Sequence, residues 1–591
     1  MPSLWGYAVN ITRLKIHNFR SIIEQEIFVQ KFSLFIGANN AGKSTIMNAI
    51  RLFYGDFNWS IEDFPKTGAH DEEVWIEIEF NLSDIEWESL ADNYKDNESN
   101  TLILRRFFKS KEIKVEKNQS NLYAIINGQL SEGCFYGASN VGLNKLGDLL
   151  YIPAITSVSD QTKMSGPSPL RNMINHLLKK VVMTSTSYQA VSDAFSLLGS
   201  EAKDENGFLS QISNPINTAL KSWDISLDLS LAPIQPEDIS KSLIKHTFLD
   251  STLGDEGVHI DNYGHGFQRS VIYELISLAT KFKDEKKSAK KEFSPTFNLI
   301  LFEEPEAFLH PNQQENMAYQ LRTLSKLSDH QVFITSHSPN FLDKAHENLL
   351  EIIRVKRDFG ITCIHQPTQE ILECLFGKGI QFINLLQHMV DEKGDAAGGA
   401  KDLLPKEEIN EADLKCIEAF RYQLWLDSER LSLFFSDTVI LTEGATEKVF
   451  FNYQLARDWG NLREHKICVV DVNGKYNFHR YMKLLEAFGI NHIVIVDGDS
   501  NQGMHKQLNR FITSCVNPFT VSKPYFFEKD FEDFLGYKSL VRQDMKPIKV
   551  MQKLEKKEIC PTKLEDLHEI VKALLNNSLN EESQKNSLKF F

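Results

Sequence analysis

The chain has 591 residues, 42% hydrophobic and 25% charged, which is the composition of a folded globular protein and excludes long disorder. With 65 Lys and Arg residues against 80 Asp and Glu, the net charge of −15 argues against a protein that coats DNA nonspecifically. No apolar run is long enough for a membrane helix, and the 7 scattered cysteines form no metal-binding pattern. We therefore expect several domains in a cytoplasmic protein with reduced thiols and no membrane contact.

The first predicted elements are strands. Residues 10–36 alternate apolar and polar positions, and so do residues 74–80, which is the period of a strand with one buried face. Between about 170 and 225 the apolar residues recur at helical spacing instead. This change of period predicts a helical insertion.

A stretch rich in Gly and Ala at 391–405 can bury little surface, so it predicts a linker or a mobile loop. Beyond it, three β-rich runs at 438–442, 467–472 and 492–496 are separated by helical patterns. This order predicts a small parallel α/β unit. The last forty or so residues have the pattern of polar helices.

A glycine-rich loop follows the apolar strand predicted at 34–36. Residues 37–44 read GANNAGKS, which fits G-x-x-x-x-G-K-[ST], and an apolar-periodic helix comes next. Glycines let backbone N–H groups surround phosphates, Lys43 reaches the β and γ oxygens, and Ser44 binds Mg²⁺. The residues predicted to bind ATP in this loop are Gly37, Asn39, Asn40, Gly42, Lys43, Ser44 and Thr45.

A buried strand ending in acids is predicted at 299–304. Alone, it would be an acidic turn after a core strand; beside a P-loop, Glu303 is predicted to join the Mg²⁺ shell and Glu304 to act as the general base. His337 ends the strand predicted at 332–336. Its order and spacing after the acids predict that it senses the γ-phosphate.

These motifs resemble the ATP-binding-cassette ATPases of the chromosome-maintenance and RecF-like branch. In that family a signature segment from a second protomer closes over the nucleotide. The matching segment is 263–270, which departs from the usual Ser-Gly-Gly-Gln form, and a glycine turn capping a helix is the alternative. The resemblance implies at least a homodimer, in which the residues that contact ATP from the partner are Gly264, Gly266, Gln268 and Arg269.

A second set of acids follows the strands of the C-terminal unit. Glu443 ends the run 438–442 and Glu447 falls one helical turn later, so both carboxylates can face one site. Asp497 and Asp499 follow the run 492–496, and such acids repel each other unless a cation offsets their charge. Either element alone could be a solvated acidic turn, but both in this order predict a metal site.

This E-G…D-x-D pattern resembles the Toprim domain of topoisomerases, primases and certain nucleases. The chain has no cysteine cluster for the zinc of a primase and no obvious room for the strand-passage domain of a topoisomerase, which leaves a nuclease. An ATPase head followed by Toprim resembles the OLD (overcoming lysogenization defect) family of ATP-dependent endonucleases. That family includes the nuclease subunit of Gabija anti-phage systems and some retron-associated effectors.

The resemblance implies a two-metal nuclease site. Residues 527–532 match the segment that supplies a further acid, with Glu532 preferred over Asp530 and Glu528. The family's lysine corresponds to Lys546, with Lys549 and Lys553 as neighbouring alternatives. The residues predicted to be catalytic in the chain are Glu304, Glu443, Asp497, Asp499, Glu532 and Lys546. Those predicted to bind metal are Ser44, Glu303, Glu443, Glu447, Asp497, Asp499, Asp530 and Glu532.

The predicted fold class is α/β: an ABC/SMC-like ATPase head with a helical insertion, then a Toprim domain with a parallel sheet. The predicted domains are an ATPase domain at 1–390 with an insertion for dimerisation at about 165–245, a linker and connecting helix at 391–430, Toprim at 431–545, and a C-terminal helical segment at 546–591.

The predicted function is that of an ATP-dependent or ATP-regulated DNA endonuclease. ATP and Mg²⁺ are the expected cofactors, with Mn²⁺ as a substitute in the nuclease site, and the resemblance alone implies a role in anti-phage defence. Whether a helicase, a reverse transcriptase or RNA is a partner stays open. The rival interpretation is an SMC-like DNA-binding or sensor ATPase with an inactive Toprim scaffold; a transporter ATPase subunit would leave the C-terminal acids without a purpose.

Overall fold

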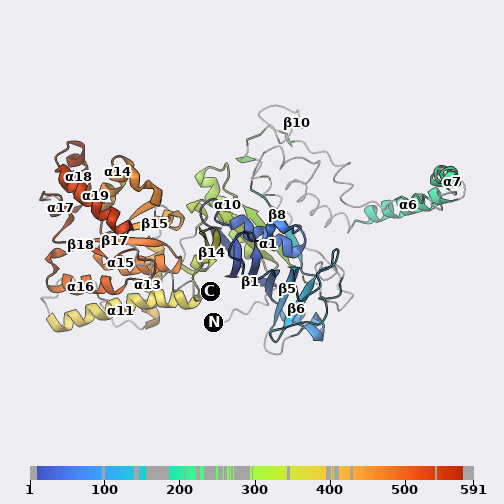
Figure 1. Ribbon diagram of the computed structural model, residues 1–591, viewed down its shortest axis with the longest axis horizontal. Helices are drawn as coiled ribbons and strands as arrows, with labels where there is room; N and C mark the ends of the chain where they lie inside the picture. Colours follow the sequence, from blue (N-terminus) through green and yellow to red (C-terminus); the bar gives the residue numbers. More distant parts are fainter. Residues whose placement is uncertain are drawn as a thin grey trace.

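The computed structural model contains an N-terminal and a C-terminal α/β body that lie side by side (Figure 1). Described residues up to 365, apart from the helical insertion, form the first body, and residues 430–576 form the second. The structure describes residues 9–95, 100–138, 145–154, 185–204, 207–220, 227–231, 248–249, 257–258, 298–342, 346–393, 411–425, 430–538 and 542–576, and single positions between 263 and 297 and at 401 and 404. Within these ranges, no helix combines the length and apolar character needed to cross a bilayer.

The first sheet of the N-terminal body is antiparallel and six-stranded, in the order β2-β1-β4-β5-β6-β7. Its strands are β1 (Asn10–Phe19), β2 (Ile22–Phe28), β4 (Val74–Asn81), β5 (Thr101–Lys109), β6 (Leu122–Ile126) and β7 (Gln129–Leu130). The strands predicted at 74–80 and within 10–36 are therefore confirmed. A short helix, α2 (Asp84–Ser89), follows β4.

The second sheet of this body has the order β14-β13-β3-β12-β11-β8 and is parallel except for β14. Its strands are β3 (Phe32–Ile36), β8 (Asp148–Ile152), β11 (Asn298–Glu303), β12 (His330–Ser336), β13 (Ile352–Asp358) and β14 (Ile361–His365). Every residue of β3 and β12 is buried, as expected for central strands covered on both faces.

Two helices cover opposite faces of the second sheet. Ile46 and Ile50 of α1 (Lys43–Tyr54) share a core with Phe35 and with the antiparallel sheet. Leu321 of α10 (Pro311–Ser325) shares the other core with Leu34. Neighbouring residues of β3 thus point to different cores, and the strand carries its loop to the edge of a rigid layer.

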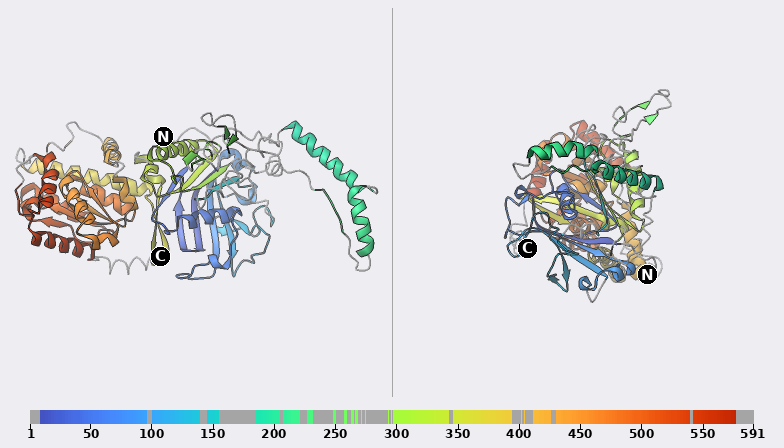
Figure 2. Two further views of the ribbon diagram at one scale, coloured as in Figure 1. Left: turned by 90° about the horizontal axis from the view of Figure 1, so that it is seen from above. Right: turned by 90° about the vertical axis from the view of Figure 1, so that its right-hand side faces the viewer.

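The helical insertion projects away from both bodies (Figure 2). Two helices, α6 (Thr186–Lys203) and α7 (Phe208–Leu220), lie within the range predicted to be helical. Much of the predicted insertion at 165–245 lies outside the described residues. Two short strands, β9 (Phe248–Leu249) and β10 (Gly257–Val258), pair after it.

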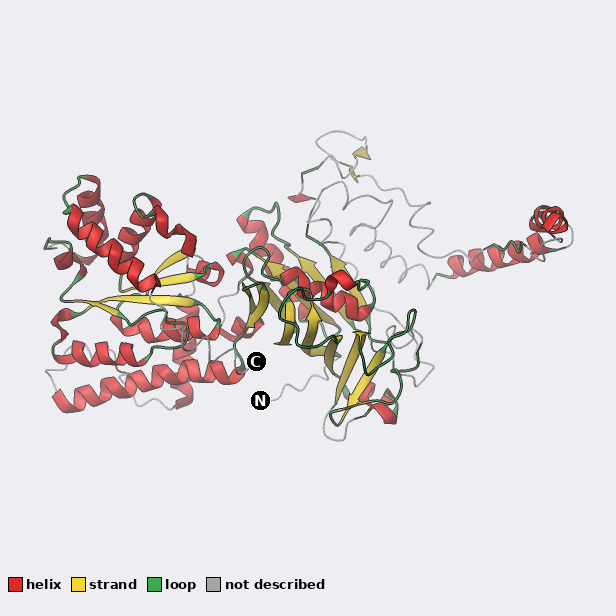
Figure 3. Cartoon of the chain, viewed as in Figure 1, coloured by secondary structure: helices red, strands yellow, loops and turns green. Residues whose placement is uncertain are grey.

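The C-terminal body contains a four-stranded parallel sheet with helices on both faces (Figure 3). In the order β16-β15-β17-β18, its strands are β16 (Ile467–Asp471), β15 (Thr438–Thr442), β17 (Asn491–Asp497) and β18 (Tyr525–Phe527). Its helices are α14 (Ala445–Ala456), α15 (Phe478–Ala487), α16 (Gly503–Ser514), α17 (Phe531–Phe534), α18 (Lys546–Glu555) and α19 (Pro561–Asn576). The predicted small parallel α/β unit is therefore confirmed.

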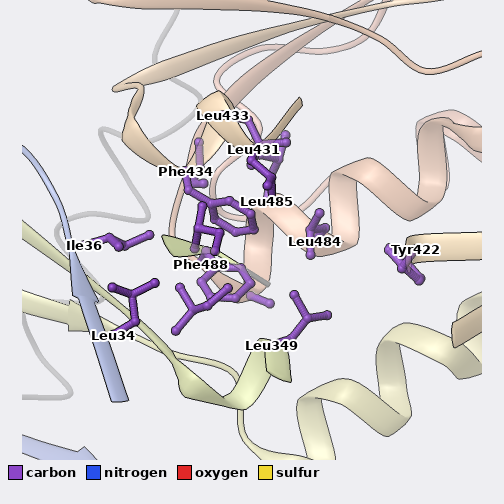
Figure 4. Close-up of a cluster of buried hydrophobic side chains, with 14 of the residues drawn as sticks. Leu34, Ile36, Leu349, Tyr422, Leu431, Leu433, Phe434, Leu484, Leu485 and Phe488 are labelled. Atoms are coloured by element: carbon purple, nitrogen blue, oxygen red, sulfur yellow. The ribbon is translucent and has the colours of Figure 1, made fainter. Parts of the chain in front are cut away.

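The two bodies share one buried core (Figure 4). Leu34 and Ile36 of β3 belong to the same cluster as Phe434 and Phe488 of the C-terminal body. Because β3 leads into the glycine-rich loop, the nucleotide site and the C-terminal body are built on continuous packing. The predicted domain boundaries stay predictions.

Two helices, α11 (Gln369–Lys393) and α13 (Glu411–Trp425), connect the two bodies in the sequence. Glu418 of α13 accepts hydrogen bonds of 2.6 and 2.7 Å from Arg480 of α15, and both residues are buried. Phe382 of α11 stacks near His479 of the same helix α15, with ring centroids 4.7 Å apart. These helices are therefore packed onto the C-terminal body.

Candidate functional site

The glycine-rich loop at 37–42 joins β3 to α1, as the sequence predicted. Gly37 has φ +152° and a Cβ there would lie 2.1 Å from the carbonyl oxygen of Val355. Gly42 has φ +114° and a Cβ would lie 2.3 Å from Oγ1 of Thr362. Both positions require glycine because the β13–β14 hairpin packs directly against the loop.

Lys43 is the first residue of α1 and is buried. Its Nζ donates to the carbonyl oxygens of Gly37 at 3.0 Å and Ala38 at 3.1 Å, and lies 2.8 Å from Nε2 of His337. Burial lowers the pKa of Lys43 to about 8, against the opposing charges of Glu304, Glu306 and Glu303. An anionic phosphate in the loop would restore the full charge of this ammonium group.

The acids predicted after β11 lie beside this loop. One carboxylate oxygen of Glu303 accepts a hydrogen bond of 2.7 Å from Ser44 and the other accepts one of 2.9 Å from Tyr151. Ser44 and Glu303, the two oxygen ligands predicted for Mg²⁺, are thus already in contact, which fits the preference of this ion for hydroxyl and carboxylate oxygen. Glu304 has φ 45°, and its Oε1 lies 3.4 Å from Nε2 of His337.

A third acid of the same turn was not assigned a role from the sequence. Glu306 accepts hydrogen bonds from the hydroxyl of Ser336 at 2.9 Å and from the backbone N–H of His337 at 2.5 Å. Burial raises the pKa of Glu306 above its ordinary value. Glu306 therefore holds the backbone that carries His337 in place.

The predicted signature segment is only partly described. Gly264 and Gly266 are described, and Gly266 lies near Phe308, at the turn before α10. Gln268 and Arg269 lie outside the described residues. Their predicted contact with ATP across a dimer stays a prediction.

The second group of acids gathers at the carboxyl ends of β15 and β17. Glu443 follows β15, and Glu447 lies in the first turn of α14, where its Oε2 accepts a hydrogen bond of 3.1 Å from the N–H of Gly444. Asp497 ends β17 and accepts a hydrogen bond of 2.9 Å from the N–H of Phe531. The backbone therefore holds Glu447 and Asp497 in fixed positions.

The acid predicted in the segment after β18 joins the same group. Glu532 lies in α17, is buried, and its Oε1 lies 3.0 Å from Nζ of Lys546. Asp530 instead caps α17 by accepting a hydrogen bond of 2.8 Å from the N–H of Asp533, and Glu528 is exposed. We therefore prefer Glu532 as the further acid of this site.

Lys546 is the lysine that faces the acids. Burial lowers its pKa, but the hydrogen bond and charge of Glu532 and the charges of Asp497 and Glu447 outweigh burial, so that the pKa is raised. Lys553 instead forms an ion pair with Glu558 at 3.2 Å. The positive charge of Lys549 also contributes to the lowered pKa of Glu558. These partners favour Lys546 over its two neighbours.

The electrostatics of this group show uncompensated negative charge. Burial, followed by the charges of Glu447, Glu443, Glu532 and Asp499, raises the pKa of Asp497 to about 9. Burial also raises the pKa of Glu443 and of Glu447 to about 7. The Oε2 atom of Glu443 is buried without a hydrogen-bond partner. Divalent cations fit this donor set, because they would replace protons on hard oxygen ligands.

The acids at the carboxyl ends of β15 and β17 do not converge on one metal position. Among the described residues, no three His, Cys, Asp or Glu side chains are close enough together to hold one metal ion. Two acids of the group instead contact lysines: Asp499 is 2.7 Å from Lys475, and Glu532 is 3.0 Å from Lys546. Lys475 was missed from the sequence, although it follows β16 in a Gly-Lys step at the same end of the sheet.

Comparison with protein families assigns both bodies. Residues 10–129 and 91–342 match the AAA ATPase domain, and residues 434–499 match the Toprim domain of overcoming lysogenization defect protein-like proteins. The chain belongs to the AAA ATPase domain family and carries an OLD-like Toprim domain. The ATPase and Toprim domains predicted from their motifs are therefore confirmed, and with them the use of a nucleotide and of divalent cations.

Curated relatives extend over both domains. The Old nuclease of Escherichia phage P2 is 24% identical over 97% of this chain and 91% of its own length. The endonuclease GajA of Bacillus cereus strain VD045 is 22% identical over 86% of this chain and 79% of its own length. An Smc head bound to the C-winged helix domain of ScpA aligns with 61% of this chain and 98% of that chain, at 17% identity, but its TM-score of 0.34 is too low to carry an inference.

Proposed function

We propose that this chain is an ATP-regulated, divalent-cation-dependent DNA endonuclease. The observation that carries the proposal is the group of buried acids at one edge of the Toprim sheet, whose pKa values are raised by burial and mutual repulsion. A sheet edge with such uncompensated charge is destabilising unless cations bind there. The similarity to an Old nuclease and to an endonuclease GajA along most of the chain supports phosphodiester cleavage.

In the ATPase domain, each residue has a separate task. Lys43, whose Nζ lies at the Gly37 and Ala38 carbonyl oxygens, would bind the phosphates of ATP, and Ser44 and Glu303 would hold the accompanying magnesium ion. Glu304 orients the attacking water. The Nε2 atom of His337 lies next to both Lys43 and Glu304, so His337 is placed to contact the γ-phosphate.

In the Toprim domain, Glu443, Glu447, Asp497, Asp499 and Glu532 would hold Mg²⁺ or Mn²⁺. The bound ions would supply an activated water and would stabilise the leaving 3′ oxygen. Lys546 offers a positive charge to the scissile phosphate, since its ammonium group already faces these acids. DNA is the proposed substrate.

Assembly and biological role follow from the resemblance. We propose at least a homodimer, in which the signature segment of one copy completes the ATP site of the other. A role in anti-phage defence and an operon partner such as a helicase, a reverse transcriptase or RNA rest on the resemblance to the OLD family alone.

Nicking of supercoiled plasmid by the purified full-length chain tests the nuclease proposal. Cleavage should require Mg²⁺ or Mn²⁺, stop with a chelator, and be lost in Asp497→Ala. The exposed Asp458 lies in the same domain away from the acid group, and Asp458→Ala should cut like wild type. Equal cutting by Asp497→Ala and Asp458→Ala would show that the acid group is not the nuclease site, and the inactive-scaffold interpretation would then stand.

A further inference from the structure

Lys475 lies among the Toprim acids without having been assigned to them. It follows β16 through Asn473, with φ 55°, and Gly474, with φ 99°. The N–H of Gly474 donates a hydrogen bond of 2.8 Å to the carbonyl oxygen of Glu443. This bond ties the loop that carries Lys475 to the residue at the base of the acid group, so the position of Lys475 is set by the backbone.

The ammonium group of Lys475 contacts the D-x-D motif twice. Its Nζ donates to the carbonyl oxygen of Asp497 at 2.5 Å and to Oδ2 of Asp499 at 2.7 Å. Only 3% of the Lys475 side chain is exposed. A lysine this deeply buried needs anionic or carbonyl partners, and it has both here.

The contacts divide the acids into two groups. Asp499 is flanked by Lys475 and by Nδ1 of His505, at 2.7 and 2.9 Å. Glu443, Glu447 and Asp497 have no ion pair shorter than 4.0 Å to a described basic side chain, and Oε2 of Glu443 has no hydrogen-bond partner. A cation that enters therefore finds the unpartnered Oε2 atom of Glu443 on one side and, on the other, an oxygen of Asp499 that is already bound to Lys475.

We propose that Lys475 is a positioning residue that competes with a divalent cation for Asp499, so that the Toprim site binds its two cations in two unequal steps. The first cation binds tightly on the Glu443 side, where the Oε2 atom of Glu443 has no hydrogen-bond partner. The second binds on the Asp499 side and is weakened because the Lys475–Asp499 contact must break. This inference rests on the proposed nuclease function and specifies how its site is loaded.

Direct Mn²⁺ binding to the full chain without nucleotide tests this inference. Free Mn²⁺ is measured by electron paramagnetic resonance during titration, and the ions lost in Asp497→Ala are assigned to the Toprim site. Wild type should show one tight and one weaker Toprim ion. In Lys475→Met the weaker step should tighten by about tenfold to a hundredfold, the range for one hydrogen bond to a charged group.

Lys448→Met is the matched control. Lys448 lies on α14, is mostly buried, and its Nζ lies 3.4 Å from Oδ1 of Asp471, which is not one of the proposed metal-binding acids. Its removal should leave the Mn²⁺ isotherm unchanged. A Lys475→Met isotherm that superimposes on those of wild type and Lys448→Met would overturn the inference.

The Mn²⁺ binding isotherm of the wild type tests the inference by itself, even if Lys475→Met does not fold. Two equally tight Toprim ions would overturn the role of Lys475 while leaving the nuclease proposal intact. No Mn²⁺ lost in Asp497→Ala would overturn both, and plasmid nicking by the same wild-type preparation then shows whether another site cuts DNA.

Discussion

Arg354 donates a hydrogen bond of 3.0 Å to the carbonyl oxygen of Gly489 and so joins the two catalytic domains. Arg354 lies on β13, and the carbonyl of its neighbour Val355 packs against Gly37 of the P-loop. The same guanidinium group also donates to the carbonyl oxygens of Phe434, Phe488 and Ser436. Direct contacts therefore link the P-loop, β13 and the Toprim backbone.

Arg354→Met should destabilise the chain and weaken the effect of ATP on DNA cutting. Burial lowers the pKa of Arg354 to about 10, yet its removal would leave carbonyl oxygens buried without donors. At roughly 1–3 kcal/mol for each lost partner, we expect the free energy of unfolding to fall by at least about 3 kcal/mol. Urea denaturation measures this change.

Arg357→Met is its control, because Arg357 lies on the same strand but is exposed, and its side chain bonds among the described residues only to Gly360 of the hairpin, at 3.1 Å. If both variants unfold at the same urea concentration and respond equally to ATP, the Arg354 contacts do not couple the domains.

The ATP site should separate binding from hydrolysis. Lys43→Ala should weaken ATP binding, whereas Glu304→Gln should bind ATP and hydrolyse it at least about a hundredfold more slowly, because Glu304 orients water and Lys43 holds phosphate. Equilibrium binding and phosphate release measure the two effects. Glu315→Gln, on the exposed face of α10, should behave like wild type. Hydrolysis of ATP by Glu304→Gln at the wild-type rate would show that Glu304 is not the general base.

The two chemistries should be separable but coupled in one direction. Asp497→Ala and Glu443→Ala should lose DNA cleavage and keep ATP hydrolysis, because the P-loop and the acids of β11 belong to a different sheet. Lys43→Ala should change how cutting depends on nucleotide, since head closure can only reposition the Toprim domain or its DNA path. Phosphate release and plasmid cutting, each with and without ATP, form the paired assay. Cutting by Lys43→Ala that matches wild type under every nucleotide condition would contradict the coupling.

Much of the fold was predictable because it depends on local patterns. The P-loop, the acid strand and the parallel Toprim sheet each carry their own signal: a strand, a glycine turn, and polar residues at the strand end. Arg354 carries no such signal. Its partners are the carbonyl oxygens of four residues that lie 80 to 135 positions away along the chain, and nothing in their side chains marks them.

The site was predictable in part for the same reason. Glu443, Asp497 and Asp499 follow strands of one parallel sheet, so their meeting at one edge follows from the strand order. Lys475 follows the edge strand β16, and this strand end has no acid pair to draw attention to it. Which acid of 528–532 joins the site depended on the capping of α17 by Asp530, a contact that only the folded chain shows.

Acid should destabilise the Toprim domain through His492. Nδ1 of His492 donates to the carbonyl oxygen of Ile490, so Nε2 accepts the hydroxyl of Thr520, and the ring is fully buried as the neutral form. Burial lowers the pKa of His492 to about 4, below its value when unfolded. The unfolded chain therefore binds more protons between about pH 6.5 and 4, and stability is lost as pH falls through that window, by up to about 3 kcal/mol.

Urea denaturation of wild type and His492→Leu across this window checks the sign. The variant should be less stable at pH 7 and should show a shallower loss on acidification. The exposed His388 on α11 offers the control His388→Leu, which should keep the wild-type slope. A His492→Leu slope as steep as that of wild type would show that another group is responsible.

The chain should be at least a homodimer when it is active. The proposed signature segment reaches ATP only across a two-fold interface between ATPase domains. Light scattering with and without ATP measures the mass in solution. A strict monomer that hydrolyses ATP and cuts DNA at full rate would rule out the shared site.

The core shared by β3 and the Toprim domain has a practical consequence for dissecting this protein into fragments. Cutting the chain between residues 391 and 430 would leave Phe434 and Phe488 facing water on one piece, and Leu34 and Ile36 on the other. Exposed apolar surface of this kind promotes aggregation. Point substitutions in the intact chain, and not isolated domains, are therefore the sound way to assign its two activities.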